Sequence, residues 1–290
     1  MKYFNFSLFL FPFYSFAQIP NGTDIFLADC KFNQQKIIIE NPVNITQREG
    51  YDNQPRFADD GKSIYYVAIK EDKQADIYNY DIATKAIKLL TTTAESEYSP
   101  IITPNQKSFS VVRVEKDSTQ RLWQFPLDCS RPSLVCSGID SIGYYNWVSD
   151  TSFVFFKVTE PPTLWLANTK NNSEKYLTNK CGRSIHKKNN SEIYFTQVID
   201  TTRWICSMNL NDKKIKPIVA CISGSEDFIA PEKGYFIEGS GSKLFSYSDV
   251  KSKTWQQIAD FSQQGVASIK RISMSNDKTK IAFVSDNSKP

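Results

Sequence analysis

Residues 55–66 read Pro-Arg-Phe-Ala-Asp-Asp-Gly-Lys-Ser-Ile-Tyr-Tyr. The Asp-Asp-Gly-Lys segment in the middle suits a tight turn, because Gly and Asp tolerate positive φ or hydrogen-bond to the nearby backbone. The aromatic and β-branched residues on either side favour extended strands. This stretch therefore predicts a β-hairpin in which an apolar strand lies on each side of a polar turn.

The second half of this hairpin returns five more times along the chain. Runs rich in β-branched and aromatic residues occupy 63–69, 108–114, 152–158, 192–198, 233–239 and 280–286. Their anchor residues, which are spaced 40 to 46 positions apart, are Ile64, Phe109, Phe153, Ile193, Tyr235 and Ile281. A period of about 40–45 residues is typical of four-stranded units stacked in a ring, the blades of a β-propeller.

The two ends of the repeat complement each other. Two strands expected over 24–30 and 36–45 have no hairpin before them, and the last hairpin, over 269–286, has no strand pair after it. Pairing the two ends would complete a blade and remove the exposed edges of the sheet. The sequence therefore predicts an all-β, six-bladed propeller of four-stranded antiparallel blades, closed by its N-terminal and C-terminal strands.

Residues 1–17 are expected to be a secretory signal peptide that is cleaved before Gln18. A lysine at position 2 precedes an apolar run over 3–14, and small residues stand where a signal peptidase needs them. The run is too short to cross a bilayer, which needs roughly 20 apolar residues. The residue directly after the cleavage point is Gln18 and not a cysteine, so no lipid anchor is expected. We therefore expect a periplasmic or secreted protein without a membrane span, and one propeller domain over 18–290.

The formal charge is modest, +4 over 290 residues, and the basic residues are dispersed. A nucleic-acid-binding domain would gather them into a patch, commonly with stacking aromatic residues. Nucleic acid is therefore not an expected partner.

Six cysteines in an exported chain raise the question of disulfides. Cys129 and Cys136 flank a turn, and Cys206 and Cys221 flank a hairpin, so each pair is expected to lie roughly opposite on antiparallel strands. Two disulfides are one interpretation, and four small buried apolar residues are the other. The remaining two cysteines belong to distant repeats and are expected to be unpaired. No spacing of Cys or His resembles a metal site, and no cofactor is expected.

Residues 55–66 and 272–283 resemble the PD40, or WD40-like, repeat of TolB-type propellers, whose pattern is roughly P-x-F-S-P-D-G-K-x-I-x-F. The second copy lacks the Pro and the Gly, and residues 99–107 are a weaker third copy. The resemblance implies a binding role in the cell envelope, with a protein or peptide as partner. TolB itself carries an extra N-terminal α/β domain, for which only a handful of residues are left between position 17 and the first expected strand.

Catalytic groups are sparse in this sequence. The single histidine, His186, stands beside two lysines before an expected turn and is interpreted as an exposed turn residue. Nucleophile elbows, zinc-binding helices and P-loops do not occur either. No catalytic residue is therefore assigned.

The loops fall into two sets of opposite charge. Turns within the hairpins, and between the third and fourth strands, are rich in lysine, whereas the loops of the opposite face are acidic. Such polarity orients a charged partner, although lysine in tight turns also simply keeps sheets soluble. The two tyrosines among the candidates either line the acidic mouth or pack between blades. The candidate binding residues are Glu95, Glu97, Tyr98, Tyr144, Glu226 and Asp227.

A glycan-active hydrolase or lyase is the alternative function. It would need two channel-face carboxylates about 5–10 Å apart, and the acids of this face are candidates, although surface loops are commonly acidic. Arg183 and Arg203 alone make a poor set for gripping a substrate carboxylate. The expected function is therefore a non-enzymatic module that binds a protein or peptide.

Overall fold

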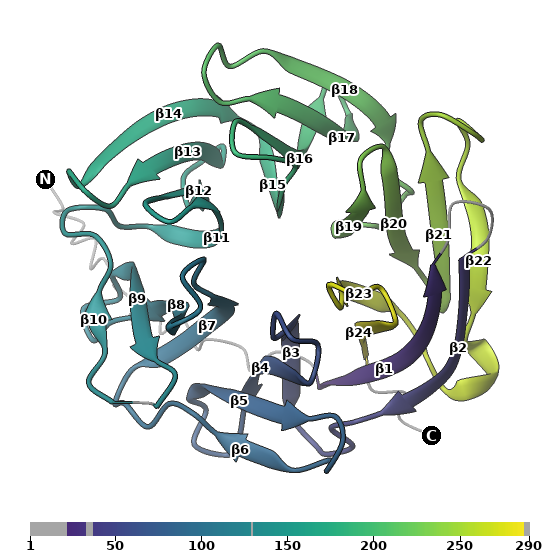
Figure 1. Ribbon diagram of the computed structural model, residues 1–290, viewed down its shortest axis with the longest axis horizontal. Coiled ribbons are helices and arrows are strands. Elements are labelled where there is room, and N and C mark those ends of the chain that lie inside the picture. Colours follow the sequence, from purple (N-terminus) through teal and green to yellow (C-terminus); the bar gives the residue numbers. More distant parts are fainter. Residues whose placement is uncertain (1–21, 33–36, 129, 287–290) are drawn as a thin grey trace, which may run out of the picture.

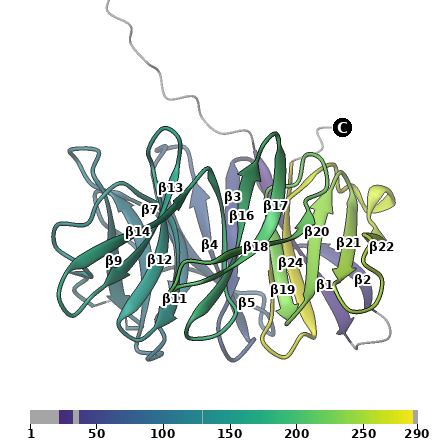
Figure 2. The ribbon, with the colours of Figure 1, turned by 90° about the horizontal axis from the view of Figure 1, so that it is seen from above.

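Strands make up nearly all of the described chain, which comprises residues 22–32, 37–128 and 130–286 of the computed structural model. Within these ranges the one helical element is a 3-10 turn at Ser262–Gln264. The strands form a ring around a central opening, and the chain follows the ring once from end to end (Figure 1). From the side, the ring is a disc crossed by steeply inclined strands (Figure 2). The expected all-β propeller is confirmed.

Four separate four-stranded antiparallel sheets follow one another around the ring. In each of them the first strand of the sequence is innermost and the fourth lies on the outer rim (Figure 1). The strands are β7 (Ser96–Ile102), β8 (Ser108–Val114), β9 (Gln120–Pro126) and β10 (Ser133–Leu134); β11 (Ile142–Ser149), β12 (Ser152–Lys157), β13 (Thr163–Asn168) and β14 (Ser173–Asn179); β15 (Cys181–Lys187), β16 (Glu192–Ile199), β17 (Thr202–Asn209) and β18 (Ile215–Ala220); β19 (Phe228–Glu232), β20 (Tyr235–Ser240), β21 (Lys243–Ser248) and β22 (Gln256–Asp260).

The other eight strands are hydrogen-bonded into one mixed sheet. In spatial order they are β23 (Ile269–Met274), β24 (Lys280–Asp286), β1 (Thr23–Phe32), β3 (Tyr51–Phe57), β4 (Ser63–Ile69), β5 (Ala75–Asp81) and β6 (Ile87–Leu89), with β2 (Ile37–Asn44) paired to β1. In the described chain a parallel pair occurs only between β1 and β3, where Thr23 lies opposite Tyr51. The four-stranded antiparallel blades are confirmed for four sheets, but the expected six separate blades are not found, because the remaining eight strands form one mixed sheet.

The two ends of the chain share this large sheet, as the repeat predicted. β1 pairs antiparallel with β24 over seven residues, and Phe26 of β1 stacks on Phe283 of β24 with ring centroids 5.5 Å apart. Burying a large apolar side chain contributes roughly 1.5–3 kcal/mol. Apolar packing therefore adds to the backbone hydrogen bonds in holding the ends together.

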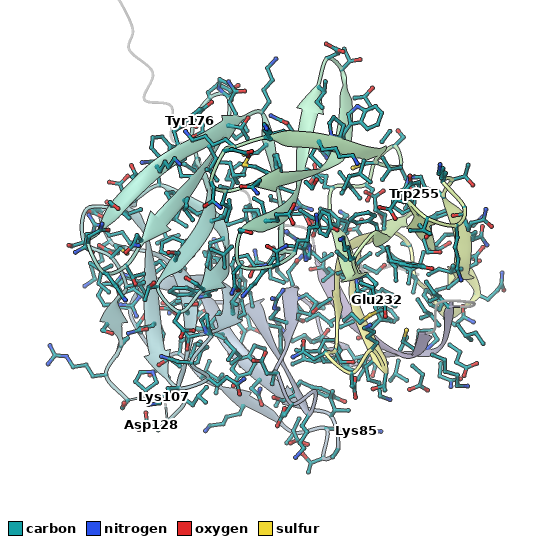
Figure 3. The ribbon with its side chains drawn as sticks, turned by 45° about the horizontal axis from the view of Figure 1, so that its top comes forward. Lys85, Lys107, Asp128, Tyr176, Glu232 and Trp255 are labelled. Carbon is teal, nitrogen blue, oxygen red and sulfur yellow. The ribbon has the colours of Figure 1, made fainter. Side chains whose placement is uncertain are left out.

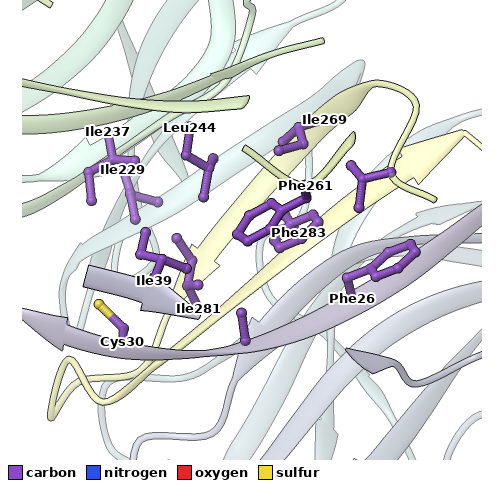
Figure 4. Close-up of a cluster of buried hydrophobic side chains, with 12 residues drawn as sticks. Phe26, Cys30, Ile39, Ile229, Ile237, Leu244, Phe261, Ile269, Ile281 and Phe283 are labelled. Atoms are coloured by element: carbon purple, nitrogen blue, oxygen red, sulfur yellow. The ribbon is translucent and has the colours of Figure 1, made fainter. Parts of the chain in front are cut away.

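A buried apolar cluster ties the closing strands to the preceding sheet (Figure 4). Phe26 and Ile39 enter it from β1 and β2, Ile281 enters from β24, and Ile237 enters from β20. Each of them is less than one-tenth exposed. The N-terminal strands thus contribute to the core as well as to the sheet.

Burial along the strands follows their place in the sheet. In β8, every residue from Phe109 to Arg113 is buried, because neighbouring sheets cover both of its faces. The rim strands β6 and β10 are exposed throughout. Coverage on both faces explains why the repeated runs that define the period are almost continuously apolar.

The predicted hairpin at 55–66 is present. Arg56 lies opposite Tyr65 and Phe57 opposite Ile64, and the amide of Gly61 donates a hydrogen bond to the carbonyl of Ala58 at 2.9 Å. Gly61 has a φ of 69°, a conformation that suits glycine because it lacks a Cβ.

The cysteine predictions have different outcomes. Cys206 and Cys221 are free, and they are not opposite each other: Cys206 faces Pro217 across the β17–β18 pair, whereas the amide of Cys221 donates a hydrogen bond to the carbonyl of Arg203. The predicted Cys206–Cys221 disulfide is therefore wrong. Cys129 lies outside the described residues, so a bond from it to the buried Cys136 stays a prediction.

Candidate functional site

The innermost strands line a channel through the ring. Each inner strand contributes one residue at the equivalent position of the repeat, and these six residues, which line the channel, are Arg56, Ile101, Asn146, His186, Ala230 and Ser273. Alternation explains the pattern, because successive side chains of a strand point to opposite sides. The variable position of the repeat motif is thus the position that gives the channel its chemistry.

Two cavities, of about 400 and 120 Å³, lie along the channel and share the walls made by Arg56, Ile101 and His186. The larger cavity is lined by later residues of the inner strands and by their turns, such as Asp59. The smaller cavity is lined by earlier residues, such as Tyr144. All six inner strands therefore run through the channel in the same direction.

The smaller cavity opens beside a set of charged and aromatic residues, here called the arginine mouth: Tyr144, Arg183, Asp227 and Arg271. Asp227 holds both arginines, with Arg183 Nε 2.9 Å from Oδ1 and Arg271 Nη1 3.2 Å from Oδ2. These residues come from three different sheets, so the ion pairs join strands that are distant in the sequence.

Tyr144 completes the mouth. Its hydroxyl accepts a hydrogen bond from Arg271 Nη2 at 3.1 Å, and the guanidinium carbon lies 5.0 Å from the centre of its ring. Although burial by itself would lower the pKa of Arg271, the Asp227 carboxylate raises it above its ordinary value. The arginine is therefore a fixed cation that holds the tyrosine ring in place.

The predicted acidic face is wrong at this mouth, because arginines neutralise its acids. Glu226 lies 2.5 Å from Arg183 and 3.6 Å from Arg203, and Asp227 is paired twice. The sequence analysis judged Arg183 and Arg203 a poor set because it did not place Arg271, which is remote in the sequence, beside them. With Glu226 and Arg203 beside it, the mouth has three arginines against two carboxylates, which leaves a small positive charge.

The structure separates the other candidates from this mouth. Glu97 is completely buried, accepts hydrogen bonds from Arg113 Nε at 3.0 Å and from the Thr93 hydroxyl, and has its pKa raised to about 7 by burial. Tyr98 packs against two buried clusters between sheets. Glu95 is a partly exposed loop residue beside Thr93. Of the six predicted binding residues, Tyr144, Glu226 and Asp227 are thus brought together, and Glu97 is not available to a ligand.

His186 is not the exposed turn residue that its lysine neighbours indicated. It lines the channel between the two cavities, where its Nε2 lies 3.2 Å from the hydroxyl of Ser184 and its ring packs 4.6 Å from that of Phe228. Burial, together with the charge of Arg56, lowers its pKa to about 4. The histidine is therefore neutral at neutral pH and is held by neighbours.

Sequence reasoning missed Arg56, although it lies in the stretch that identified the fold. The signal was available, because the position between Pro55 and Phe57 alternates with two buried residues. The candidate residues predicted from the sequence lie in or beside loops, whereas Arg56 belongs to the inner strand β3.

Over residues 22–32, 37–128 and 130–286, no group of three or more His, Cys, Asp or Glu side chains is placed to hold a metal ion. In the same ranges, no helix has the length and apolarity needed to span a membrane.

Comparison with known proteins places the fold. No family model matches the sequence, and no curated protein does either. Among solved structures, a putative TolB from Agrobacterium tumefaciens superposes with a TM-score of 0.68 at 14% identity, covering 92% of this chain and 98% of that one. TolB from Acinetobacter baumannii gives 0.60 at 14% identity, covering 93% of this chain and 66% of that one.

The structure of this chain is also similar to that of an enzyme. A gluconolactonase from Xanthomonas campestris superposes with a TM-score of 0.64 at 6% identity, covering 92% of this chain and 98% of that one. Identities this low concern the fold, and one fold supports both binding and catalysis. The resemblance of the repeat is confirmed at that level: the chain has the β-propeller fold of TolB structures.

Proposed function

We propose that this chain is an exported, non-enzymatic propeller that binds a protein or peptide partner in the cell envelope through the arginine mouth. The observation that carries the proposal is the pairing of Tyr144 with Arg271 at the end of the channel. Tyrosine and arginine are enriched in protein interfaces and dominate their binding energy. The ring of Tyr144 is held by a fixed cation, so little side-chain entropy is lost on binding.

The mouth also lacks features expected of a carboxylate enzyme. Glu226 and Asp227 are both paired with arginines, so neither is a free carboxylate. The neighbouring Glu238 does have a pKa raised to about 7 by burial, but it is 1% exposed and accepts a hydrogen bond from the amide of Ile222 at 2.8 Å. The alternative, a glycan-active hydrolase or lyase using channel-face carboxylates, is therefore less well supported than binding.

The proposal includes a ring of six blades. Two features of the eight-stranded sheet support counting it as two: strands β23, β24, β1 and β2 pair antiparallel, as do β3 to β6, and one parallel residue pair joins the two groups. An experimental structure in which β1 and β3 form a longer ladder would contradict this count.

Export is the second part of the proposal. The expected signal peptide over 1–17 lies outside the described residues, and its apolar run and small terminal residues are its support. Mass spectrometry of the mature protein from its native host should give a chain that begins at Gln18, in a periplasmic or secreted fraction. A chain that retains Met1 would contradict export by this route.

The binding role is tested by affinity capture from native envelope extract with purified protein as bait. Tyr144→Ala is compared with Tyr176→Ala, which removes a tyrosine that is 40% exposed on the outer rim (Figure 3). A partner retained by the wild type and by Tyr176→Ala, but lost by Tyr144→Ala, supports the mouth as the binding surface. Equal capture by all three baits would remove the mouth from the proposal.

A further inference from the structure

The middle of the channel contains a cation without a counter-ion. Of the eight arginines in the chain, six lie within 4.0 Å of a carboxylate, and these are Arg48, Arg113, Arg121, Arg183, Arg203 and Arg271. Arg131 is exposed. Arg56 lies in the wall between the two cavities and has no hydrogen-bond or ion-pair partner in the described part of the chain.

The surroundings make this arrangement costly. Burial lowers the pKa of Arg56. The electrostatic effects of Tyr145 and Asp59 act in the opposite direction, but neither residue forms an ion pair with it. The Arg56 side chain is partly buried, and taking a charge even partly out of water without a partner is destabilising. Every other partly buried arginine of the protein avoids that cost by facing an acid. An anion from outside the chain would complete the same arrangement at Arg56.

A second unsatisfied donor faces the same cavity. The Ser273 side chain is 6% exposed and lines the larger cavity, and its hydroxyl makes no hydrogen bond within residues 22–32, 37–128 and 130–286. The neighbouring amides are already engaged: Asn146 Nδ2 donates to the carbonyl of Ile185 at 2.8 Å, and Asn276 Nδ2 donates to the carbonyl of Asp59 at 3.1 Å. Each amide thus has a hydrogen bond within the described chain, whereas Arg56 and Ser273 have none there.

The charge of the cavity favours a monoanion. Arg56 and Lys187 are its cations without a carboxylate within 4.0 Å, and Asp59 is the carboxylate among its lining residues. Lys278 also lines it but is paired with Glu232 at 2.5 Å. With His186 neutral, two cations and one carboxylate give a net charge of +1, so a carboxylate fits better than a doubly charged phosphate.

We propose that the larger channel cavity binds a carboxylate, which accepts hydrogen bonds from the Arg56 guanidinium and the Ser273 hydroxyl. A guanidinium can bind both oxygens of a carboxylate at once, which gives short, charge-assisted hydrogen bonds. A volume of about 400 Å³ is within the range of small-ligand sites. The carboxylate can belong to a free small acid or to the C-terminus of a peptide inserted in the channel. The site is separate from the arginine mouth and does not depend on partner binding there.

The experiment uses thermal unfolding and calorimetric titration of the mature protein in a buffer of low chloride content. The probes are acetate, the tripeptide acid Ac-Ala-Ala-Ala-OH and the corresponding amide. At ten times its Kd, a bound probe should raise the Tm by about 3–5 °C. Binding of acetate and the acid would indicate a site for free acids, whereas binding of the acid alone would indicate a peptide terminus. The amide should not bind in either case.

Three variants connect the site to its residues. Arg56→Met should abolish binding, and Ser273→Ala should weaken it roughly 10- to 150-fold, about the effect of one hydrogen bond to a charged group. Arg131→Met is the matched control, because it removes the same charge from the exposed rim, and it should bind like the wild type. Without probe, Arg56→Met should be at least as stable as the wild type, because it removes a buried charge without a partner.

Three results would overturn the proposal. The first is the absence of binding by both carboxylate probes at 20 mM, on the order of the weakest useful Kd for a single ion pair. The second is binding that Arg56→Met leaves unchanged. A large loss of probe-free stability in Arg56→Met would also contradict it, since it would show that Arg56 already has a structural role without a ligand.

Discussion

The hydroxyl of Tyr145 donates a hydrogen bond to the hydroxyl of Ser110 at 2.8 Å. Tyr145 belongs to β11 and Ser110 to β8, so the bond joins the innermost strand of one sheet to the second strand of the sheet before it. Ser110 also accepts the indole N–H of Trp147 at 2.9 Å and donates to the carbonyl of Ile101 at 3.0 Å. One small hydroxyl thus satisfies three buried groups at an interface that is otherwise apolar.

Ser110→Ala should therefore destabilise the protein by about 2–4 kcal/mol, because it leaves two buried donors unsatisfied at roughly 1–3 kcal/mol each. Urea unfolding measures the loss. A double-mutant cycle with Tyr145→Phe is the control: the second change should cost less in the Ser110→Ala background, since its partner is already gone. A loss below 0.5 kcal/mol, on the scale of an ordinary surface substitution, would contradict this role.

Ring closure gives the second prediction. Phe283→Ala should reduce the free energy of unfolding by about 3–5 kcal/mol, because the side chain is fully buried and stacks on both Phe26 and Phe261. Val250→Ala is the control, since Val250 is 77% exposed. Chemical denaturation of the two variants should give clearly separated midpoints, and coinciding midpoints would show that the closing strands contribute little.

The third prediction concerns pH. Burial raises the pKa of Glu238 from 4.5 to about 7, so the folded state binds this proton more tightly than the unfolded state. The contribution to stability is fully present below pH 4.5 and is lost as the pH rises through 7. Glu238→Gln keeps an acceptor for the Ile222 amide but removes the titration. It should therefore be more stable than the wild type at pH 8, by on the order of 2–3 kcal/mol, and nearly equal to it at pH 4.5.

Denaturant midpoints at half-unit steps from pH 4.5 to 8 measure this difference. Glu71→Gln is the matched control, because Glu71 is exposed, and its difference from the wild type should not change with pH. A constant difference between Glu238→Gln and the wild type would contradict the raised pKa.

The remaining disulfide prediction is tested by counting thiols. A bond between Cys129 and Cys136 would leave four titratable thiols of the six cysteines in denatured, unreduced protein. Six thiols would exclude the bond. Reduction should then release two thiols in the first case and none in the second.

The fold was predictable because it is repeated. The hairpin at 55–66 is specified by the residues of its own turn. The anchors recur at spacings of 40 to 46 residues, so the same pattern can be recognised six times along the chain. The pairing of the chain ends followed from counting strands. The parallel contact of Thr23 with Tyr51 was not predictable, because no local pattern specifies it.

The site was predictable only in part. Asp227 and Tyr144 were found because loops beside inner strands must meet at the channel. Their charge environment was misjudged, since Arg271 joins Asp227 from 44 residues later in the chain. Cys206 and Cys221 were misjudged for a related reason: the turn between their strands lies closer to Cys206 than to Cys221, so Cys206 faces Pro217, and spacing alone does not locate a turn.

The antiparallel pairing of β1 with β24 also has a consequence for the order of folding. β1 is synthesised long before β24, since Asp29 of β1 and Lys280 of β24 are 251 residues apart, so the edge of β1 has no partner while the chain between them emerges. Contacts between residues so far apart in sequence form slowly, and an unpaired strand edge promotes aggregation. Loss of β24 should therefore leave β1 prone to aggregate.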